Sequence, residues 1–164
     1  MSPPHKKVKY KILMTLMIKF LPFSDWAPPL LFFYKTFKDE FALYDFAFKL
    51  ETKFFIEWCA DFTATERITS SVNLIKLIKG ANVANDVLDT VFKHPEEIRR
   101  GRESRKIDFT EHDAIKKILL SKLDDQHFYT LKGGKMASYL LLRLDMEMQE
   151  EDSFTSPTFP NFKK

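Results

Sequence analysis

The sequence predicts an all-α domain, a multi-helix orthogonal or bundle-like arrangement of about six to seven helices. Three observations lead to this fold class. Apolar residues recur at spacings of three and four along most of the chain, as on one buried face of a helix. Only four of the 164 residues are Gly, whereas an all-β fold would need many tight turns. Hydrophobic residues make up 45% of the chain, and its 17 Phe rings need a core or a partner surface to cover them.

The amino-terminal part is predicted to form two helices. Residues 8–20 are densely apolar at helical spacing, which indicates a helix that is buried or faces a partner, so the packing of residues 1–23 stays open. Ser24 or Asp25 can cap the next helix. The Pro pair that starts at Pro28 suits the first turn of that helix, where no amide donor is needed.

The segment 39–62 is the best-defined helix. A strand would alternate every second residue, and this segment does not. One stripe is aromatic and is interrupted by Glu51, and another face carries a charged residue every fourth position. The aromatic stripe consists of Phe41, Tyr44, Phe48, Phe55, Trp58 and Phe62, and the charged face of Asp45, Lys49, Lys53, Glu57 and Asp61. The pattern therefore predicts a helix with a wide apolar face.

Capping residues and helix breakers divide the rest of the chain. Thr63 and Glu66 form a capping box, and the helix that follows is predicted to end at Gly80. A shorter helix is predicted to hold Val83 to Phe92, because Pro95 stops further extension. Two further helices are predicted over residues 110–123 and 135–149.

The ends of the chain bear on domain organisation and localisation. We expect residues 1–150 to form a single helical domain and residues 151–164 a flexible tail without periodicity. Lysines followed by the apolar residues 12–18 resemble a secretory signal, but Lys19 interrupts the run and no small-x-small cleavage pattern follows. No stretch approaches the ~18 uninterrupted apolar residues of a membrane span. The sequence therefore predicts a cytoplasmic protein without membrane contact.

The titratable and nucleophilic residues form no complete active-site pattern. As the single cysteine, Cys59 excludes an internal disulfide and a zinc site of several thiolates, and its apolar surroundings predict a buried, inert thiol. Residues 111–113 (Glu-His-Asp) point in different directions on a helix and suit a helix start. Residues 133–135 lack the pattern of a phosphate-binding loop. The remaining histidines, His5, His94 and His127, are expected in loops without partners at ligand spacing. We therefore expect no enzyme activity, cofactor or metal.

Two basic clusters are the candidate contacts for nucleic acid, through salt-dependent neutralisation of phosphates. The net charge of +3 permits such contact without predicting it. A solvated loop is the alternative for the second cluster, since acidic residues are interspersed there. The first cluster consists of Lys6, Lys7, Lys9 and Lys11, and the second of Arg99, Arg100, Arg102, Arg105 and Lys106.

Several stretches together resemble the helical part of GmrSD-type proteins, which are modification-dependent (type IV) restriction endonucleases. The resemblance covers about residues 24–150. Its most specific part runs from Lys135 to Leu144, where a basic residue, a Tyr and a Leu-rich Leu-Arg-Leu occur as in that family. The other matching stretches are residues 26–31, 41–51, 68–79, 109–123 and 128–129.

The motifs that carry activity in the GmrSD family are missing from this sequence. The family has an amino-terminal ParB/sulfiredoxin-like domain with an Asp-Gly-Gln-Gln-Arg motif that uses nucleotide, and a carboxy-terminal His-Asn-His-type nuclease domain with a Glu-His-Ile-Leu-Pro motif. Residues 152–157 stand here instead of the second motif, and the sequence ends at Lys164. The resemblance therefore implies the helical connector of such an enzyme, catalytically silent alone.

Three functions remain open at this point. The first is a scaffold fragment in DNA restriction, acting with other chains that supply nuclease or nucleotide-binding domains. The second is a small basic nucleic-acid-binding module that uses the two basic clusters. The third is an unrelated helical adaptor whose Phe-rich face docks onto a partner helix.

Overall fold

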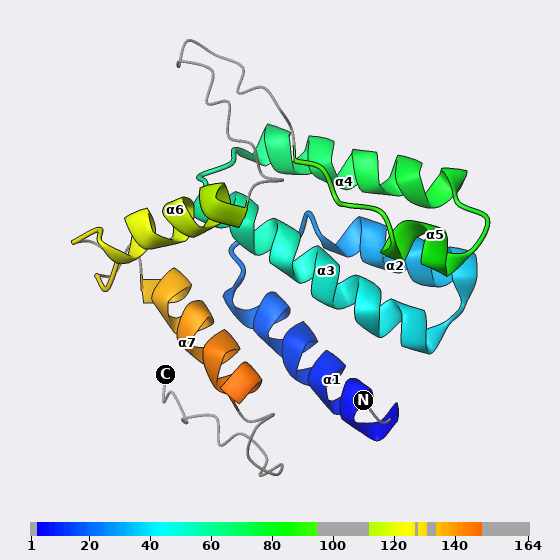
Figure 1. Cartoon of the computed structure of the whole chain (residues 1–164), viewed down its shortest axis with the longest axis horizontal. Helices are drawn as coiled ribbons and strands as arrows, with labels where there is room; N and C mark the ends of the chain where they lie inside the picture. Colours follow the sequence, from blue (N-terminus) through cyan, green and yellow to red (C-terminus); the bar gives the residue numbers. More distant parts are fainter. Residues whose placement is uncertain (1–2, 95–111, 127, 131–133, 149–164) are drawn as a thin grey trace.

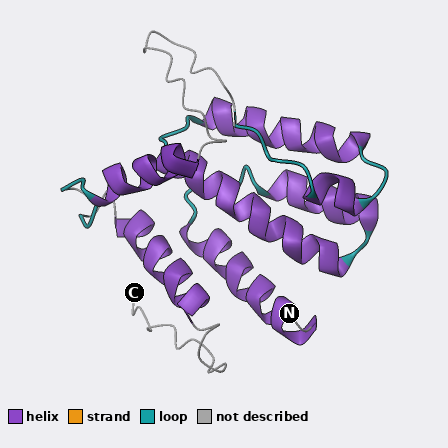
Figure 2. Cartoon of the chain, in the orientation of Figure 1, coloured by secondary structure: helices purple, strands orange, loops and turns teal. Residues whose placement is uncertain are grey.

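The structure is a computed structural model that describes residues 3–94, 112–126, 128–130 and 134–148 of the chain. Within these residues it contains seven α-helices and no strand, which confirms the predicted all-α class (Figures 1 and 2). The helices are α1 (Pro3–Phe20), α2 (Ala27–Phe37), α3 (Glu40–Cys59), α4 (Ala64–Gly80), α5 (Ala84–Leu88), α6 (His112–Leu123) and α7 (Gly134–Met148).

Helix α3 lies at the centre of the arrangement. It packs against α1, α2, α5 and α6, while α4 packs against α2 and α7 against α1 (Figure 1). The longest helix therefore has neighbours around much of its circumference. This surrounded position decides which of its side chains are buried.

The helix ends follow local capping chemistry. The Asp39 side chain accepts hydrogen bonds from the amides of Phe41 and Ala42 at the start of α3. The predicted capping box at the start of α4 is confirmed, with the Thr63 amide donating to Glu66 at 2.6 Å. Each cap satisfies amide donors that have no partner within the helix.

Two predicted helix boundaries are wrong. Helix α1 begins at Pro3 rather than at Val8, and its two prolines occupy the first turn, where a missing amide hydrogen costs nothing. Helix α5 ends at Leu88, well before Phe92. The chain leaves the helix there because the carbonyl groups of Leu88 and Thr90 accept hydrogen bonds from the Lys49 ammonium group on α3.

The capping residue proposed for α2 is also different. Trp26 occupies the N-cap position, and its side chain makes no capping hydrogen bond to the helix. The Ala27 amide donates to the Ser24 carbonyl at 2.9 Å, so the backbone of Ser24, rather than its side chain, accepts a hydrogen bond from the start of α2. The Asp25 carboxylate pairs instead with Arg67 of α4, at 2.9 Å.

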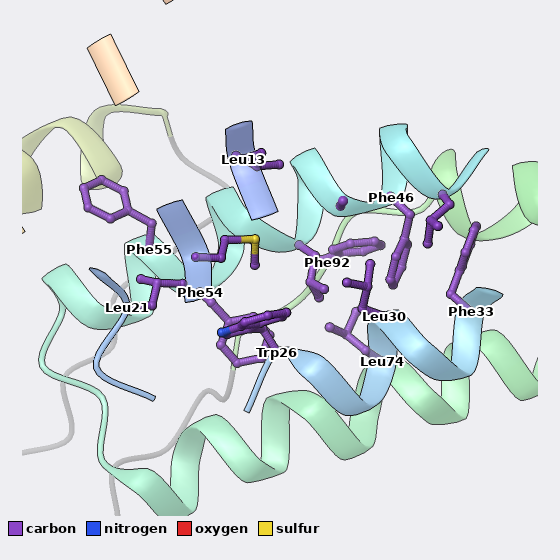
Figure 3. Packing of buried hydrophobic residues seen from close by; sticks show 14 of the residues in the cluster. Leu13, Leu21, Trp26, Leu30, Phe33, Phe46, Phe54, Phe55, Leu74 and Phe92 are labelled. Carbon is purple, nitrogen blue, oxygen red and sulfur yellow. The ribbon is translucent and has the colours of Figure 1, made fainter. Parts of the chain in front are cut away.

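The core forms where α1, α2, α3 and α4 meet. Phe33 of α2 stacks on Phe46 of α3 with ring centroids 4.1 Å apart, and Phe92 packs edge-on against Phe46 (Figure 3). Leu13 of α1 is completely buried, so the amino-terminal helix, whose packing the sequence left open, contributes to the core. The thiol of Cys59 is free and buried, which confirms the prediction for this residue.

The aromatic stripe predicted on α3 is only partly the buried face. Phe41 is half exposed, and Phe48 and Trp58 are partly exposed, whereas Phe46 and Phe54 are completely buried. A single apolar stripe is expected when a helix has one covered side. Because α3 is covered on several sides, a second set of rings faces the core.

Candidate functional site

A row of five charged residues winds around α3 and its end, and we call it the charged row. Residues four apart on a helix are displaced by about 40° around the axis, so the row turns from one neighbouring helix to another. Its two ends lie near the surface. Asp45 pairs with Lys6 of α1 at 2.9 Å, and Asp61 pairs with Lys122 of α6 at 2.6 Å. The charged row comprises Asp45, Lys49, Lys53, Glu57 and Asp61.

The middle of the charged row holds the connection that follows α5. The Lys49 ammonium group donates to the Thr90 carbonyl at 3.0 Å and to the Leu88 carbonyl, and it lies 4.9 Å from the centre of the Phe92 ring. The Lys53 ammonium group donates to the Lys93 carbonyl at 2.6 Å. Two lysines thus satisfy backbone acceptors of an irregular segment, which we call the 88–94 segment.

The carboxylate of Glu57 gathers three donors from three parts of the chain. Its Oε1 accepts from Lys53 Nζ at 2.7 Å, from Ser70 Oγ at 2.5 Å and from His94 Nδ1 at 3.0 Å. Glu57 and Ser70 are completely buried, and Lys53 nearly so. The second oxygen, Oε2, is buried and has no hydrogen-bond partner among the described residues. We call Lys53, Glu57, Ser70 and His94 the Glu57 cluster.

His94 lies in a loop, as predicted, but its surroundings differ from those of an ordinary loop histidine. Its ring is buried, bonded to Glu57, and 6.1 Å from the centre of the Phe62 ring. Burial lowers the pKa of His94; the hydrogen bond to Glu57 opposes this shift and the charge of Lys53 adds to it. His127, and the side chain of His5, lie outside what the structure describes.

The hydrogen-bond order of the Glu57 cluster differs from that of a nucleophilic triad. In such a triad the histidine accepts the proton of the serine, and the acid orients the histidine. Here Ser70 and His94 both donate to the same oxygen of Glu57, so this contact does not activate the Ser70 hydroxyl. Ser70 is also completely buried. The cluster in this arrangement holds α3, α4 and the 88–94 segment together.

A second buried carboxylate on α3 binds α7. The Glu51 Oε1 accepts from the Tyr139 hydroxyl at 2.6 Å, and its Oε2 accepts from Arg143 Nε at 3.2 Å. Arg143 also donates to Glu147 on its own helix. This contact explains why Glu51 interrupts the aromatic stripe of α3. We call Glu51, Tyr139 and Arg143 the Glu51 cluster.

Burial and the neighbouring charges shift the pKa values of the groups in and near the Glu51 cluster. Burial and the neighbouring Glu51 raise the pKa of Tyr139, so its hydroxyl stays protonated. Burial alone would lower the pKa of Arg143, but Glu51 and Glu147 outweigh it and the net direction is upward. Burial raises the pKa of the nearby Cys59 thiol to about 12, so the thiol is not a nucleophile at neutral pH.

The lysines of the first predicted basic cluster have different environments. Lys6 is paired with Asp45, and Lys9 is only 5% exposed. Burial lowers the pKa of Lys9, against the attraction of Glu147. Lys7 and Lys11 are exposed on α1. The structure therefore leaves two of the four lysines accessible to a phosphate.

Several predicted features fall outside the described part of the chain. Arg99, Arg100, Arg102, Arg105 and Lys106 lie there, as do Glu111 and Gly133. Helix α6 begins at His112, and nothing is described of its side chain or that of Asp113. Helix α7 begins at Gly134, which confirms a helix start at this position.

The described residues contain neither a group of metal ligands nor a helix that could span a membrane. No three His, Cys, Asp or Glu side chains of this part lie close enough together to hold a metal ion. None of its helices combines the length and the apolar character needed to cross a membrane.

Comparison of the chain with models of protein families, with curated proteins and with solved structures found no match. Any proposal about function therefore depends on the geometry of the chain itself.

Proposed function

We propose that this chain is a helical scaffold that binds other protein chains and is catalytically silent by itself. The observation that carries the proposal is the outer face of α7. Leu141, Leu144 and Met148 are 63%, 51% and 71% exposed. Their spacing of three and four places them on one side of the helix, opposite the buried Tyr139. We call these three residues the α7 row.

The α7 row differs from ordinary scattered surface leucines. Its residues are consecutive on one face, and single exposed apolar residues would need no explanation. Covering one such side chain fully contributes about 1.5–3 kcal/mol to association before the costs of binding. Leu144 lies on the outer face because α7 directs Tyr139 and Met146 into the domain instead.

The identity of the partner is proposed from the resemblance alone. The α7 row begins inside residues 135–144, the stretch that most specifically resembles the GmrSD family. In that reading the partners are cytoplasmic chains that supply the nuclease or nucleotide-binding part of a DNA-restriction system. A free, buried cysteine fits such a reducing compartment.

The scaffold proposal is tested by co-expressing the chain with the products of the coding frames on either side. We expect a complex that survives purification and is lost in the double variant Leu141→Glu/Leu144→Glu. The matched control is Ile68→Glu/Val72→Glu on α4, two apolar residues of similar exposure away from α7. Equal loss in both variants, or no complex at all, would refute the role of the α7 row.

Catalytic silence has its own test. The purified chain is incubated with modified and unmodified DNA, divalent metal ions and nucleotide. We expect no cleavage above buffer. Reproducible cleavage that co-elutes with the chain and is abolished by Glu57→Gln would contradict the proposal and assign chemistry to the Glu57 cluster.

A small nucleic-acid-binding module is the second candidate, favoured by the exposed Lys7 and Lys11 on α1. Each phosphate contact adds salt-dependent affinity. Fluorescence anisotropy with a labelled duplex measures it at rising salt. The candidate predicts weaker binding in Lys7→Ala/Lys11→Ala and in Arg99→Ala/Arg100→Ala/Arg102→Ala, and binding indifferent to both changes would remove it.

A further inference from the structure

We infer that the surface formed by the first half of α1, the end of α2 and the start of α3 binds single-stranded nucleic acid, with bases stacked on aromatic rings and phosphates held by lysines. Helices α2 and α3 are joined there by residues 38–39 at one edge of the molecule (Figure 1). The inference rests on the second candidate function, nucleic-acid binding, and is independent of the scaffold proposal. We call the rings of Tyr10, Tyr34, Phe41 and Tyr44 the aromatic platform.

The rings of the aromatic platform meet around Tyr44, which is buried. Tyr10 of α1 packs against Tyr44 with ring centroids 4.7 Å apart, and Phe41 lies edge-on to Tyr44 at 6.3 Å. Burial raises the pKa of Tyr10, and the hydroxyls of Tyr44 and Tyr34 raise it further, so Tyr34 of α2 lies in the same neighbourhood. Three helices therefore contribute rings to one surface.

Two rings of the aromatic platform remain about half exposed. Tyr34 is 46% and Phe41 is 51% exposed, and Tyr10 is partly exposed. Single exposed apolar residues are ordinary, but these rings surround one buried neighbour, so accessible aromatic surface is gathered in one place. A flat exposed ring can stack on a nucleobase, and such stacking depends little on which base is present.

Lysines border the aromatic platform. Lys35 directly follows Tyr34, and Lys38 is the C-cap residue of α2. On α1, Lys7 lies about one turn before Tyr10. All three lysines are exposed, and none of them forms an ion pair among the described residues. Their positive charge attracts phosphate groups and repels a cationic ligand.

The acidic residues of the same surface are engaged within the fold. Asp45 pairs with Lys6 at 2.9 Å, and Asp39 caps the first turn of α3. Glu40 accepts a hydrogen bond from the Tyr44 hydroxyl at 3.4 Å. Each acid therefore has a partner of its own, which leaves the exposed lysines to an anion.

The combination of rings and lysines favours a single strand over a duplex. In a duplex the faces of the bases are stacked on one another, so an exposed ring reaches only the backbone and the base edges. In a single strand the bases can turn onto the rings while the lysines neutralise phosphates. Removing one stacking ring weakens the binding of such strands about fivefold or more.

Fluorescence anisotropy with the full chain measures the preference. The probes are a labelled oligothymidylate, an abasic strand of the same length and a duplex. We expect the oligothymidylate to bind about fivefold or more tightly than the other two, and all binding to weaken as the salt concentration rises. A duplex bound equally well through Lys7 and Lys11 would overturn the inference and leave the second candidate function standing. Absence of binding to every probe would remove both.

Ring variants separate stacking from charge. Tyr34→Ala and Phe41→Ala should each weaken the binding of the oligothymidylate about fivefold or more and leave that of the abasic strand unchanged. Tyr34→Phe keeps the ring and should bind like the natural protein. The matched control is Tyr129→Ala, which removes an exposed ring that follows α6. Equal effects of Tyr34→Ala and Tyr129→Ala, or an equal loss toward the abasic strand, would overturn the inference.

Crosslinking of the natural protein covers the case in which the variants fail to fold. A strand that carries iodouracil forms a covalent link, on irradiation, to an aromatic ring on which the base stacks. We expect links to Tyr34, Phe41 or Tyr10, located by mass spectrometry of the digested protein. Links only to other residues, or none from a strand that binds, would overturn the inference.

Discussion

Two buried glutamates of α3 are held by different kinds of partner. Glu51 has both oxygens occupied, by the Tyr139 hydroxyl and the Arg143 guanidinium group of α7. Glu57 gathers all its described donors on one oxygen, and one of them is an imidazole. The raised pKa values of Tyr139 and Arg143 keep both groups protonated at any ordinary pH, whereas burial lowers the pKa of His94 and so favours its neutral form.

The difference shows how the same helix serves two purposes. The Glu51 cluster fixes α7 to α3 with groups that do not titrate near neutrality. The Glu57 cluster fixes an irregular segment with a group that does. Two clusters built on buried carboxylates of similar exposure can therefore respond differently to acid, depending on the donor that each carboxylate meets.

The largest expected effect comes from breaking the ion pair within the Glu57 cluster. Glu57→Gln leaves the buried ammonium group of Lys53 without a counter-charge, and such a loss costs about 3–5 kcal/mol. Urea unfolding followed by circular dichroism measures the free energy of unfolding. The control is Asp61→Asn, a charge at the exposed end of the charged row, which should cost no more than about 1 kcal/mol. Equal costs for the two changes would contradict the buried ion pair.

A smaller effect is expected in the Glu51 cluster. Tyr139→Phe removes the donor to Glu51 Oε1 and leaves that oxygen buried, at a cost of about 1–3 kcal/mol. The same urea titration measures it. Tyr129→Phe is the matched control, because Tyr129 is largely exposed and the change should be nearly neutral. A neutral Tyr139→Phe would mean that the hydrogen bond from the Tyr139 hydroxyl to Glu51 does not stabilise the fold.

The response to acid sharpens the comparison further. Because the pKa of His94 is lowered in the folded chain, the unfolded chain binds more protons, and the free energy of unfolding should fall as the pH drops below 6.5. His94→Asn should remove this part of the fall, while Tyr139→Phe should keep it. An identical pH profile for the natural protein and His94→Asn would show that His94 does not contribute.

The smallest effect is expected at the exposed start of the charged row. Lys6 and Asp45 form a partly exposed pair, and such pairs contribute about 0–1 kcal/mol. Lys6→Met should therefore change the free energy of unfolding little, and the remaining effect should shrink in high salt. A loss as large as that of Glu57→Gln would show that the ends and the middle of the row are equivalent.

Local chemistry made much of the fold predictable from the sequence. Asp39 and Thr63 mark helix starts because their side chains satisfy backbone amides within a few residues. The thiol of Cys59 is buried, as its apolar surroundings predicted, and Leu13, Leu16 and Met17 of α1 are buried in the core. The charged row is visible as a repeat of four.

The candidate site was less predictable because its partners are distant in sequence. His94 and Glu57 are 37 positions apart, and only the path of α4 and α5 brings them together. Lys9 is buried although it belongs to a lysine-rich stretch, because α7 packs against α1. The sequence did contain one signal of buried charges on α3. Glu51 interrupts the aromatic stripe, and the charged row lies on a helix that other helices surround.

A double-mutant cycle on Lys53 and Glu57 tests most directly whether the buried middle of the charged row stabilises the fold. The free energies of unfolding of Lys53→Met, Glu57→Gln and the double variant are compared with that of the natural protein. We predict that the double variant is more stable than Glu57→Gln alone, because no unpaired buried charge remains, and that the coupling exceeds about 1 kcal/mol. Additive losses, with a coupling within about 0.5 kcal/mol of zero, would contradict the buried pair and with it the role given to the row.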